Sequence, residues 1–209
     1  MGSPRRVGAE TSQTRDALLD AVEQLMREQG YAGVTYRAVA AKAGVTAGLV
    51  QYYFPKQDDV FVAAVRRRSE QNLSRLRQAL DADPDRTLRV LWEYSREESA
   101  AALTTEFMAL GNHRPSVRTV IAEVTEQVRQ VQLEALARVW KRRDEAQLDL
   151  TPESLLFLLT GVPKLLRLEA GIGVSTTHAQ AVAAFDAYLD RVEPTSPRRG
   201  RTARSRKRG

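Results

Sequence analysis

The sequence predicts an all-α fold of about nine helices, with a small three-helix domain at the N-terminus and a larger helical domain after it. Apolar residues recur at helical spacing through most of the 209 residues, as at Leu18, Val22, Leu25 and Met26. No segment shows the apolar and polar alternation that indicates a half-buried strand. Short stretches rich in glycine, proline and aspartate separate the helical segments, so each helix is expected to end at a turn.

Composition limits the class of protein. With 43% hydrophobic residues, the chain is long enough to bury a core in one or two domains. It has no cysteine, which excludes a disulfide scaffold, thiol catalysis and thiolate metal sites. The N-terminus is polar, and no later stretch stays apolar for the length of a membrane span. We therefore expect a cytoplasmic protein with no membrane partner.

The positive charge is concentrated at the C-terminus. Residues 194–209 hold seven basic and no acidic side chains, so the rest of a chain of net charge +6 sums to −1. Within that remainder, residues 1–57 carry a net charge of +2 and residues 58–193 a net charge of −3. We expect a disordered basic tail at 194–209 and a modest positive excess beside the N-terminal helices.

Two short helices are predicted between residues 35 and 54. Thr35 can cap the first of them, and Gly44 suits the left-handed residue that ends it. Thr46 can cap the second, which must end by Phe54 because Pro55 disfavours helical geometry at the residue before it. An earlier helix is expected to begin near residue 11 or 12 and to stop at Gly30.

The remaining segments complete the predicted organisation. Further helices are expected at about 57–80, 85–101, 104–111, 115–143, 152–170 and 176–192. The predicted organisation is a flexible arm at 1–11, a first domain of short helices at 12–56, a larger helical domain at 57–193, and the tail at 194–209.

Two short helices joined by a glycine-containing turn form a helix-turn-helix, whose second helix fits the major groove of B-DNA. Small residues at its start, Ala47 and Gly48, allow close approach to the sugar-phosphate wall. Gln51 can pair with an adenine edge, and the Tyr52 hydroxyl can reach a phosphate. The apolar positions are expected to hold the two helices together: Val39, Val45, Val50 and Phe54. On helical pattern alone, a short helix packed in a bundle fits equally well.

The order of residues resembles that of a known family. The stretch from Thr35 to Phe54, followed by PKQDDV, is similar to the N-terminal DNA-binding domain of the TetR family of bacterial transcriptional regulators. The similarity covers about residues 12–65. It includes the Gly-Tyr pair at 30 and 31, the turn Ala-Gly-Val-Thr at 43–46, Gly48, and the run Tyr-Tyr-Phe at 52–54.

The resemblance implies which residues contact DNA. It assigns phosphate contacts to the capping residues Thr35 and Thr46 and to Tyr52. It assigns base reading to Ala47, Gly48, Val50 and Gln51. Lys56 and Gln57 replace the usual Ser-Lys at the start of the fourth helix, so either Lys56 makes the family's lysine–phosphate contact from one position earlier or that contact is lost.

For the second domain the resemblance is one of architecture. It implies a domain that encloses a small-molecule site and pairs two subunits, with 152–170 and 176–192 as the dimer helices. The candidate dimer residues are Leu159, Leu166, Phe185 and Tyr188. A helix central to a monomer core is the alternative for 152–170, because its apolar residues surround most of the helix.

The candidate effector pocket is lined by residues that an apolar cavity would use. They are Trp92, Phe107, Met108, Trp140 and Phe157, with His113 or Arg114 as the polar group that orients a ligand. Ordinary core packing is the alternative for each aromatic, and capping of a helix junction is the alternative for His113. The only other histidine is His178, and no cluster shows metal-ligand spacing, so no metal or cofactor is expected.

Enzyme signatures are absent from the sequence. There is no phosphate-binding glycine loop, nucleophile elbow or pair of carboxylates in an apolar run, so no catalytic residue is assigned. We expect a homodimeric transcriptional regulator of double-stranded operator DNA, with a palindromic or pseudo-palindromic site. It is expected to act as a repressor that a small-molecule effector releases from DNA. A constitutive or architectural DNA-binding protein without an effector is the alternative.

Overall fold

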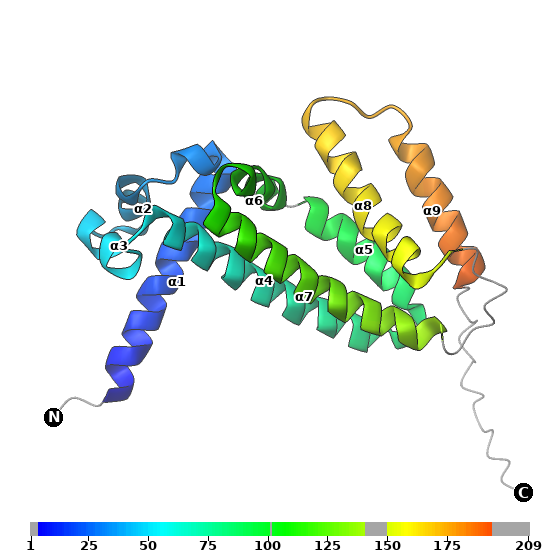
Figure 1. Ribbon diagram of the computed structural model, residues 1–209, viewed down its shortest axis with the longest axis horizontal. Helices are drawn as coiled ribbons and strands as arrows, with labels where there is room; N and C mark the ends of the chain where they lie inside the picture. The colour runs from blue at the N-terminus through cyan, green and yellow to red at the C-terminus, as the bar shows by residue number, and fades with distance from the viewer. Residues whose placement is uncertain (1–3, 101, 141–149, 194–209) are drawn as a thin grey trace, which may run out of the picture.

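The computed structural model describes residues 4–100, 102–140 and 150–193, and this part of the chain is helical and contains no strand. The predicted all-α fold is confirmed (Figure 1). The first elements are α1 (Pro4–Gln29), the 3₁₀ segment η1 (Tyr31–Gly33), α2 (Tyr36–Ala43), α3 (Ala47–Tyr53) and α4 (Gln57–Ala82). The others are η2 (Pro84–Arg86), α5 (Thr87–Ala100), α6 (Ala102–His113), α7 (Pro115–Trp140), α8 (Pro152–Gly171) and α9 (His178–Val192). The predicted basic tail at 194–209 lies outside the described residues.

Helix α1 begins at Pro4, about two turns before the expected start near residue 11 or 12. Proline is well tolerated in the first turn of a helix, and no second proline interrupts the backbone before Gly30. The capping residues that suggested the later start therefore lie inside the helix. The flexibility predicted for residues 1–11 stays a prediction.

The N-terminal core extends past the predicted domain boundary at residue 56. Leu18, Val22, Leu25 and Met26 are buried on one face of α1, as their spacing predicts. The same cluster contains residues from α2, α3 and α4, and also from α6 and α7: Leu103, Phe107, Leu110, Val117 and Val120. The short helices at the N-terminus are thus packed directly on elements assigned to the second domain.

Polar contacts reinforce this junction. A Glu106 carboxylate oxygen of α6 accepts a hydrogen bond from the Tyr31 backbone N–H at 3.2 Å. At the start of α4, the Asp58 carboxylate accepts hydrogen bonds from Arg114 and Ser116, which flank the start of α7. Movement of α6 or of the start of α7 therefore bears directly on the N-terminal domain.

A second core joins α5, α7, α8 and α9. It is centred on Trp92, whose ring stacks on Phe185 of α9 with centroids 4.7 Å apart. Arg89 of α5 forms ion pairs with Asp186 at 2.7 Å and Asp190 at 2.5 Å. The buried Glu193 carboxylate accepts hydrogen bonds from the first turn of α5, which includes the Arg89 N–H at 2.8 Å. These contacts hold α9 against α5.

Helices α4 and α7 lie side by side and connect the two ends of the molecule (Figure 1). Helices α2 and α3 lie at one end, and α8 and α9 at the other. Within the described residues, no helix is both long enough and apolar enough to cross a membrane.

We expect Asp58→Asn to weaken the junction between α4 and α7. The hydrogen bond from Ser116, and then that from Arg114, lowers the Asp58 pKa below its ordinary value of 3.8. Because the folded pKa is depressed, this stabilisation is present above pH 3.8 and is lost as the pH falls through the folded pKa. Partial exposure weakens each contact, so the loss in unfolding free energy at neutral pH should be about 1 kcal/mol.

Denaturant unfolding at neutral and acidic pH measures this effect, with the exposed Asp81→Asn as the matched control. The Asp58→Asn protein should show a flatter acid limb than the wild-type protein. If the Asp58→Asn and wild-type proteins have equal unfolding free energies at each pH, the junction does not depend on this carboxylate.

Candidate nucleic-acid interface and effector cavity

The turn between α2 and α3 has the predicted local geometry. The Thr35 hydroxyl accepts a hydrogen bond from the Ala38 N–H at 3.1 Å, and the Thr46 hydroxyl accepts one from the Leu49 N–H at 3.3 Å. Both threonines cap their helices as expected. Gly44 ends α2 at φ 68° and ψ 32°, the left-handed conformation that favours glycine. These residues fix the direction in which α3 leaves α2.

The inward face of α3 is anchored in the N-terminal core. Val50 is 0% exposed and Phe54 is buried, and the Tyr36 hydroxyl donates to the Phe54 carbonyl at 2.6 Å. The base-reading role that the family resemblance implied for Val50 is therefore wrong, because its side chain has no access to a ligand. The interpretation from its apolar character, that Val50 holds the two helices together, is correct.

The outward face of α3 carries the other candidate residues. Gln51 is exposed, Ala47 is half-buried, and Tyr52 is 76% exposed, with its ring edge-on to Tyr53 at 5.5 Å. Gly48 is also exposed, and a Cβ added there would meet no atom within 4 Å. Its backbone is not in the left-handed region. Nothing in the chain's own fold therefore requires glycine at position 48.

Gln57 and Lys56, at the start of α4, have different roles. The Gln57 amide donates to the Val34 carbonyl at 2.7 Å, so this side chain braces the loop before α2. Lys56 is exposed, and its backbone N–H donates to Asp59 at 2.8 Å. The arrangement leaves the lysine side chain at the surface beside the end of α3.

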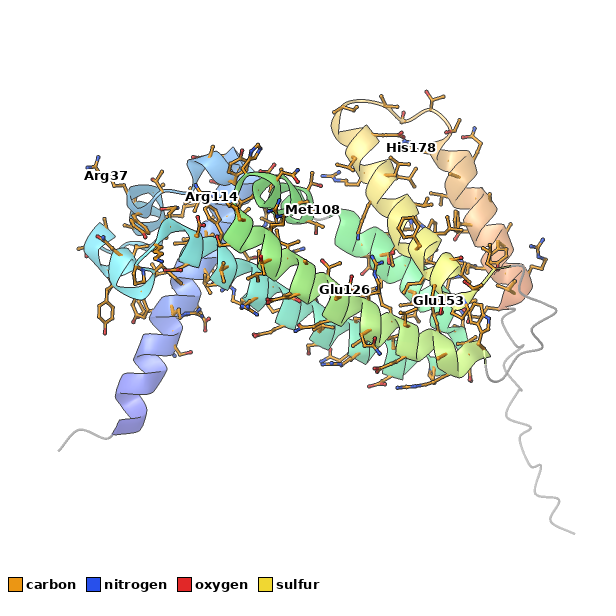
Figure 2. The ribbon with its side chains drawn as sticks, in the orientation of Figure 1. Arg37, Met108, Arg114, Glu126, Glu153 and His178 are labelled. Atoms are coloured by element: carbon orange, nitrogen blue, oxygen red, sulfur yellow. The ribbon has the colours of Figure 1, made fainter. Side chains whose placement is uncertain are left out.

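Sequence reasoning missed Arg37. This residue lies in the first turn of α2, is exposed, and has no ion-pair or hydrogen-bond partner among the described residues. Figure 2 shows its side chain directed away from the molecule at the α2–α3 end. A positive charge in the first turn opposes the helix dipole, so this placement favours an external anion over a helix-stabilising role. The signal in the sequence is a basic residue two positions after the capping threonine.

A cavity of about 210 Å³ lies where the two cores meet. Residues of α4, α5, α6, α7 and α8 line it. Phe107 and Met108 of α6 are among them, as expected from the sequence. Val65, Ile121 and Val124 extend this apolar side. Because Phe107 also belongs to the N-terminal core, one side chain contacts both the cavity and the domain that carries α3.

The other predicted pocket residues lie elsewhere. Trp92 is fully buried in the second core, and its ring N–H donates to Asp186 at 3.1 Å. Trp140 packs against the same core. His113 lies beside the Tyr31 ring at 6.3 Å, and Arg114 pairs with Asp58, so both occupy the helix junction (Figure 2). The structure does not place these four residues in the pocket; core packing was the alternative for Trp92 and Trp140, and a helix junction was the alternative for His113.

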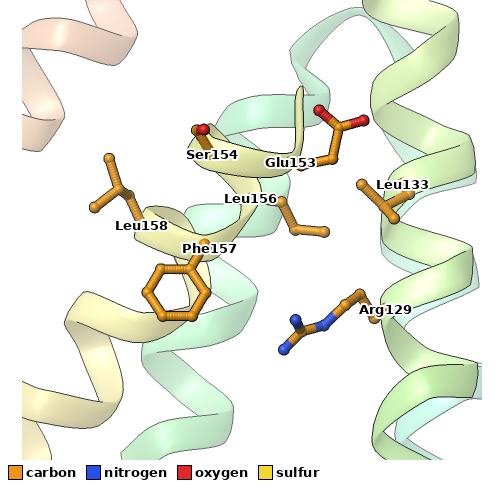
Figure 3. Close-up of a pocket in the computed structure, with 7 residues that line it drawn as sticks. All are labelled: Arg129, Leu133, Glu153, Ser154, Leu156, Phe157 and Leu158. Atoms are coloured by element: carbon orange, nitrogen blue, oxygen red, sulfur yellow. The ribbon is translucent and has the colours of Figure 1, made fainter. Parts of the chain in front are cut away.

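Phe157 lines a different, open cleft between α7 and α8, of about 560 Å³ (Figure 3). The cleft is also lined by Arg129, Leu133 and Glu153. In Figure 3 the Arg129 side chain reaches from α7 toward α8, with its guanidinium directed toward the Phe157 ring. Arg129 lines both this cleft and the inner cavity, so it stands between them.

The inner cavity contains cations that sequence reasoning did not identify. Burial, and then the nearby Arg129 guanidinium, lowers the pKa of Lys164 below its ordinary value of 10.5. Among the described residues, neither Lys164 nor Arg129 has an ion-pair or hydrogen-bond partner. The signal for Lys164 was a lone lysine in the apolar run LLFLLTGVPKLLRL of α8.

Of the four predicted dimer residues, Leu159 is buried, and Leu166, Phe185 and Tyr188 are half-buried. Leu159 is 0% exposed within the second core, and Leu166 lies seven residues later on the same side of α8. Phe185 and Tyr188 of α9 also pack against that core. The expectation that Leu159 faces a partner subunit is therefore wrong. The exposed face of α8 is formed instead by Phe157, Leu165, Leu168 and Ile172.

Metal binding has no basis in the described residues, where no group of three His, Asp or Glu side chains is placed to hold an ion. His178 is 2.7 Å from a Glu169 carboxylate oxygen and joins the end of α8 to the start of α9.

Comparison with known proteins agrees with this geometry. Residues 18–64 match the family described as bacterial regulatory proteins, tetR family. The HTH-type transcriptional repressor BepR of Brucella suis biovar 1 is 30% identical over 124 residues, which cover 59% of this chain and 56% of that protein. The HTH-type transcriptional regulator BetI of Paraburkholderia xenovorans is 32% identical over 132 residues, 62% of each chain. The matches thus span less than two thirds of the length of these relatives.

The fold is shared over most of the chain. A transcriptional regulator of Saccharomonospora viridis, solved in complex with choline, superposes with a TM-score of 0.69 at 18% identity, covering 86% of this chain and 96% of that one. Helices α2 and α3, with one face of α3 exposed, form a helix-turn-helix. Residues 18–64 are similar to the tetR family, which confirms the resemblance seen in the sequence.

We expect Lys164→Met to stabilise the protein when no ligand is bound. A half-buried ammonium group without a counter-charge opposes folding, and methionine fills a similar volume. The gain should be about 1 kcal/mol in unfolding free energy at neutral pH. Because the folded pKa is lowered, the penalty of the wild-type lysine is present below that pKa and is relieved as the pH rises toward 10.5.

Chemical denaturation at neutral and alkaline pH measures the gain, and the exposed Lys56→Met is the control for loss of a surface charge. The difference between Lys164→Met and the wild-type protein should shrink as the pH rises. A variant less stable than the wild type at neutral pH would mean that Lys164 is satisfied inside the protein.

Proposed function

We propose that this protein is a dimeric transcriptional regulator that binds operator DNA through α3 and acts in the cytoplasm as a repressor released by a small-molecule effector. The observation that carries the proposal is the two-sided character of α3. Val50 and Phe54 fix one face in the core, while Gly48, Gln51 and Tyr52 are exposed on the other. The relatives named above are helix-turn-helix regulators, which supports the same function and gives no reason to expect an enzyme.

The exposed residues suit distinct contacts with DNA. Gly48, with Ala47 beside it, allows the start of α3 to approach the groove wall closely. The Gln51 amide can read an adenine edge, and the Tyr52 hydroxyl can bind a phosphate. The proposed phosphate contacts also include Thr35, Thr46 and Lys56, with the addition of Arg37. Val50 is removed from the base-reading set.

The proposed response to an effector uses α6. Phe107 and Met108 of α6 line the cavity, while Glu106 of the same helix accepts a hydrogen bond from the Tyr31 backbone. A ligand that displaces Phe107 shifts packing in the core that positions α3. The choline complex of the Saccharomonospora viridis regulator supports ligand binding by a protein of this fold. The second candidate function is a constitutive regulator without an effector, and that function would leave the cavity without a role.

Dimerisation is proposed through the exposed face of α8. Phe157, Leu165, Leu168 and Ile172 recur at helical spacing and are 50% to 79% exposed in the single chain. The adjacent α9 exposes Ala183 and Ala187, which allow a second helix to approach closely. Two subunits joined by this symmetric contact place two α3 helices on one DNA duplex, so we propose a palindromic or pseudo-palindromic operator.

We expect Gly48→Ala to separate DNA binding from folding. The added methyl group meets nothing in the protein and raises helix propensity, so unfolding free energy should stay unchanged or rise by up to about 1 kcal/mol. On DNA the same methyl group fills the space needed for close approach. Binding to an operator selected from random duplexes should weaken by about tenfold or more.

The matched control is Gly171→Ala, at the far end of α8, where an added Cβ also meets no atom within 4 Å. This variant should bind the selected operator like the wild-type protein. Failure to select any operator would contradict the proposed function, and full affinity of Gly48→Ala would remove α3 from the DNA interface.

We expect Leu168→Glu to release monomers. Leu168 is exposed in the single chain, so the substitution leaves the subunit folded, but it would bury an unpaired charge in the proposed interface. Analytical ultracentrifugation at micromolar concentration checks this, with the exposed Arg167→Glu as a charge control on the same helix. A wild-type protein that sediments as a monomer, or a folded Leu168→Glu protein that remains dimeric, would refute this interface.

A further inference from the structure

We propose that the inner cavity binds a small apolar organic acid, with its carboxylate held by Arg129 and Lys164 and its apolar body against Phe107 and Met108. This inference rests on the proposed function, because it assigns the chemistry of the effector that the cavity would receive. It concerns residues of this chain's own second domain, which lie beyond the segment matched to the tetR family.

The charge of the cavity is one-sided. Its lining includes three basic residues, Arg68, Arg129 and Lys164, and no aspartate or glutamate among the described residues. Arg68 already takes part in another interaction, but Arg129 and Lys164 have no ion-pair or hydrogen-bond partner in the described part of the chain. Two neighbouring cations without a counter-charge repel each other at a desolvated site. An anion between them removes that repulsion and the cost of burial.

Uncharged polar groups in the same cavity also lack partners. The Ser69 hydroxyl is buried and accepts or donates no hydrogen bond within the described residues. Gln132 is 7% exposed, and its amide has no hydrogen-bond partner in that part of the chain. Buried polar atoms are nearly always satisfied in folded proteins, so the Ser69 hydroxyl calls for a polar partner in the cavity. The Ser69 hydroxyl and the Gln132 amide are both groups that can donate to a carboxylate.

The position of Arg129 indicates how a ligand could pass from the open cleft into the inner cavity. Its side chain lines both the inner cavity and the open cleft between α7 and α8 (Figure 3). Arg129 of α7 forms no ion pair with Glu153 of α8, which lines the same cleft. A negatively charged ligand that enters the cleft therefore meets a guanidinium group first and the half-buried ammonium group of Lys164 next.

The rest of the lining selects the body of the ligand. Val65, Phe107, Met108, Ile121 and Val124 form a continuous apolar side that receives hydrocarbon or an aromatic ring. The volume of about 210 Å³ is below the usual range of ligand pockets, which favours a small molecule over a long chain or a nucleotide conjugate. A small carboxylic acid with one apolar body combines both requirements.

The test uses the full-length protein and probes matched in shape. Octanoate and 4-phenylbutyrate are compared with their neutral amides and with octylamine by isothermal titration calorimetry. Each carboxylate should bind about tenfold or more tightly than its amide, because hydrogen bonds from cationic groups to a carboxylate are the strong ones. Lys164→Met should abolish this preference and Arg129→Gln should reduce it. The control variant Arg138→Gln, at an exposed position of the helix that carries Arg129, should leave the preference for the acid over the amide unchanged.

Several outcomes would overturn the inference. The amides or octylamine could bind as tightly as the acids, or neither acid could bind. A folded Lys164→Met protein could also keep the full preference for the acid over the amide. A gel-shift assay with the selected operator separates this inference from the proposed function. Acids that bind the wild-type protein without releasing DNA support the anion site and contradict effector-released repression. Specific DNA binding with no acid bound contradicts the anion site alone.

Discussion

The packing of α6 between two environments is the constraint on which the rest of the molecule depends. Phe107 belongs to the core that fixes α1 to α4 and also lines the cavity, while Glu106 on the same helix holds the backbone before α2. Because protein interiors are close-packed, a change on the cavity side of Phe107 is not absorbed locally. This packing is the basis of the proposed link between the orientation of α3 and the contents of the cavity.

Local geometry was the most predictable level of the structure. Capping at Thr35 and Thr46, the left-handed Gly44 and the helix end before Pro55 depend on residues adjacent in sequence, and the structure has each of them. The assignment of apolar residues to particular contacts was less predictable. Helical spacing identifies an apolar face but not what covers it, so the core, a cavity and a partner subunit look alike in sequence. Trp92 and Leu159 were misassigned for this reason, since both are in the second core.

Charged residues without partners were missed by the sequence analysis, whereas apolar residues were assigned to the wrong contacts. Arg37 opposes the dipole of α2, and Lys164 is half-buried beside Arg129. Neither placement stabilises the fold, and each lies on a surface or cavity for which a ligand is proposed. Gly48 belongs with them, since the chain's own packing does not require it.

Helix α8 brings the proposed effector site and the proposed dimer interface onto one element. Lys164 faces the cavity, while Leu165 and Leu168 are exposed on the neighbouring side of the same helix. A ligand that draws Lys164 toward Arg129 therefore acts on the helix that positions the second subunit. The linkage is reciprocal, because any coupling free energy between ligand binding and subunit pairing acts equally in both directions. In the proposed dimer, the spacing of the two α3 helices would then depend on the cavity by two routes, through α6 within each subunit and through α8 between subunits.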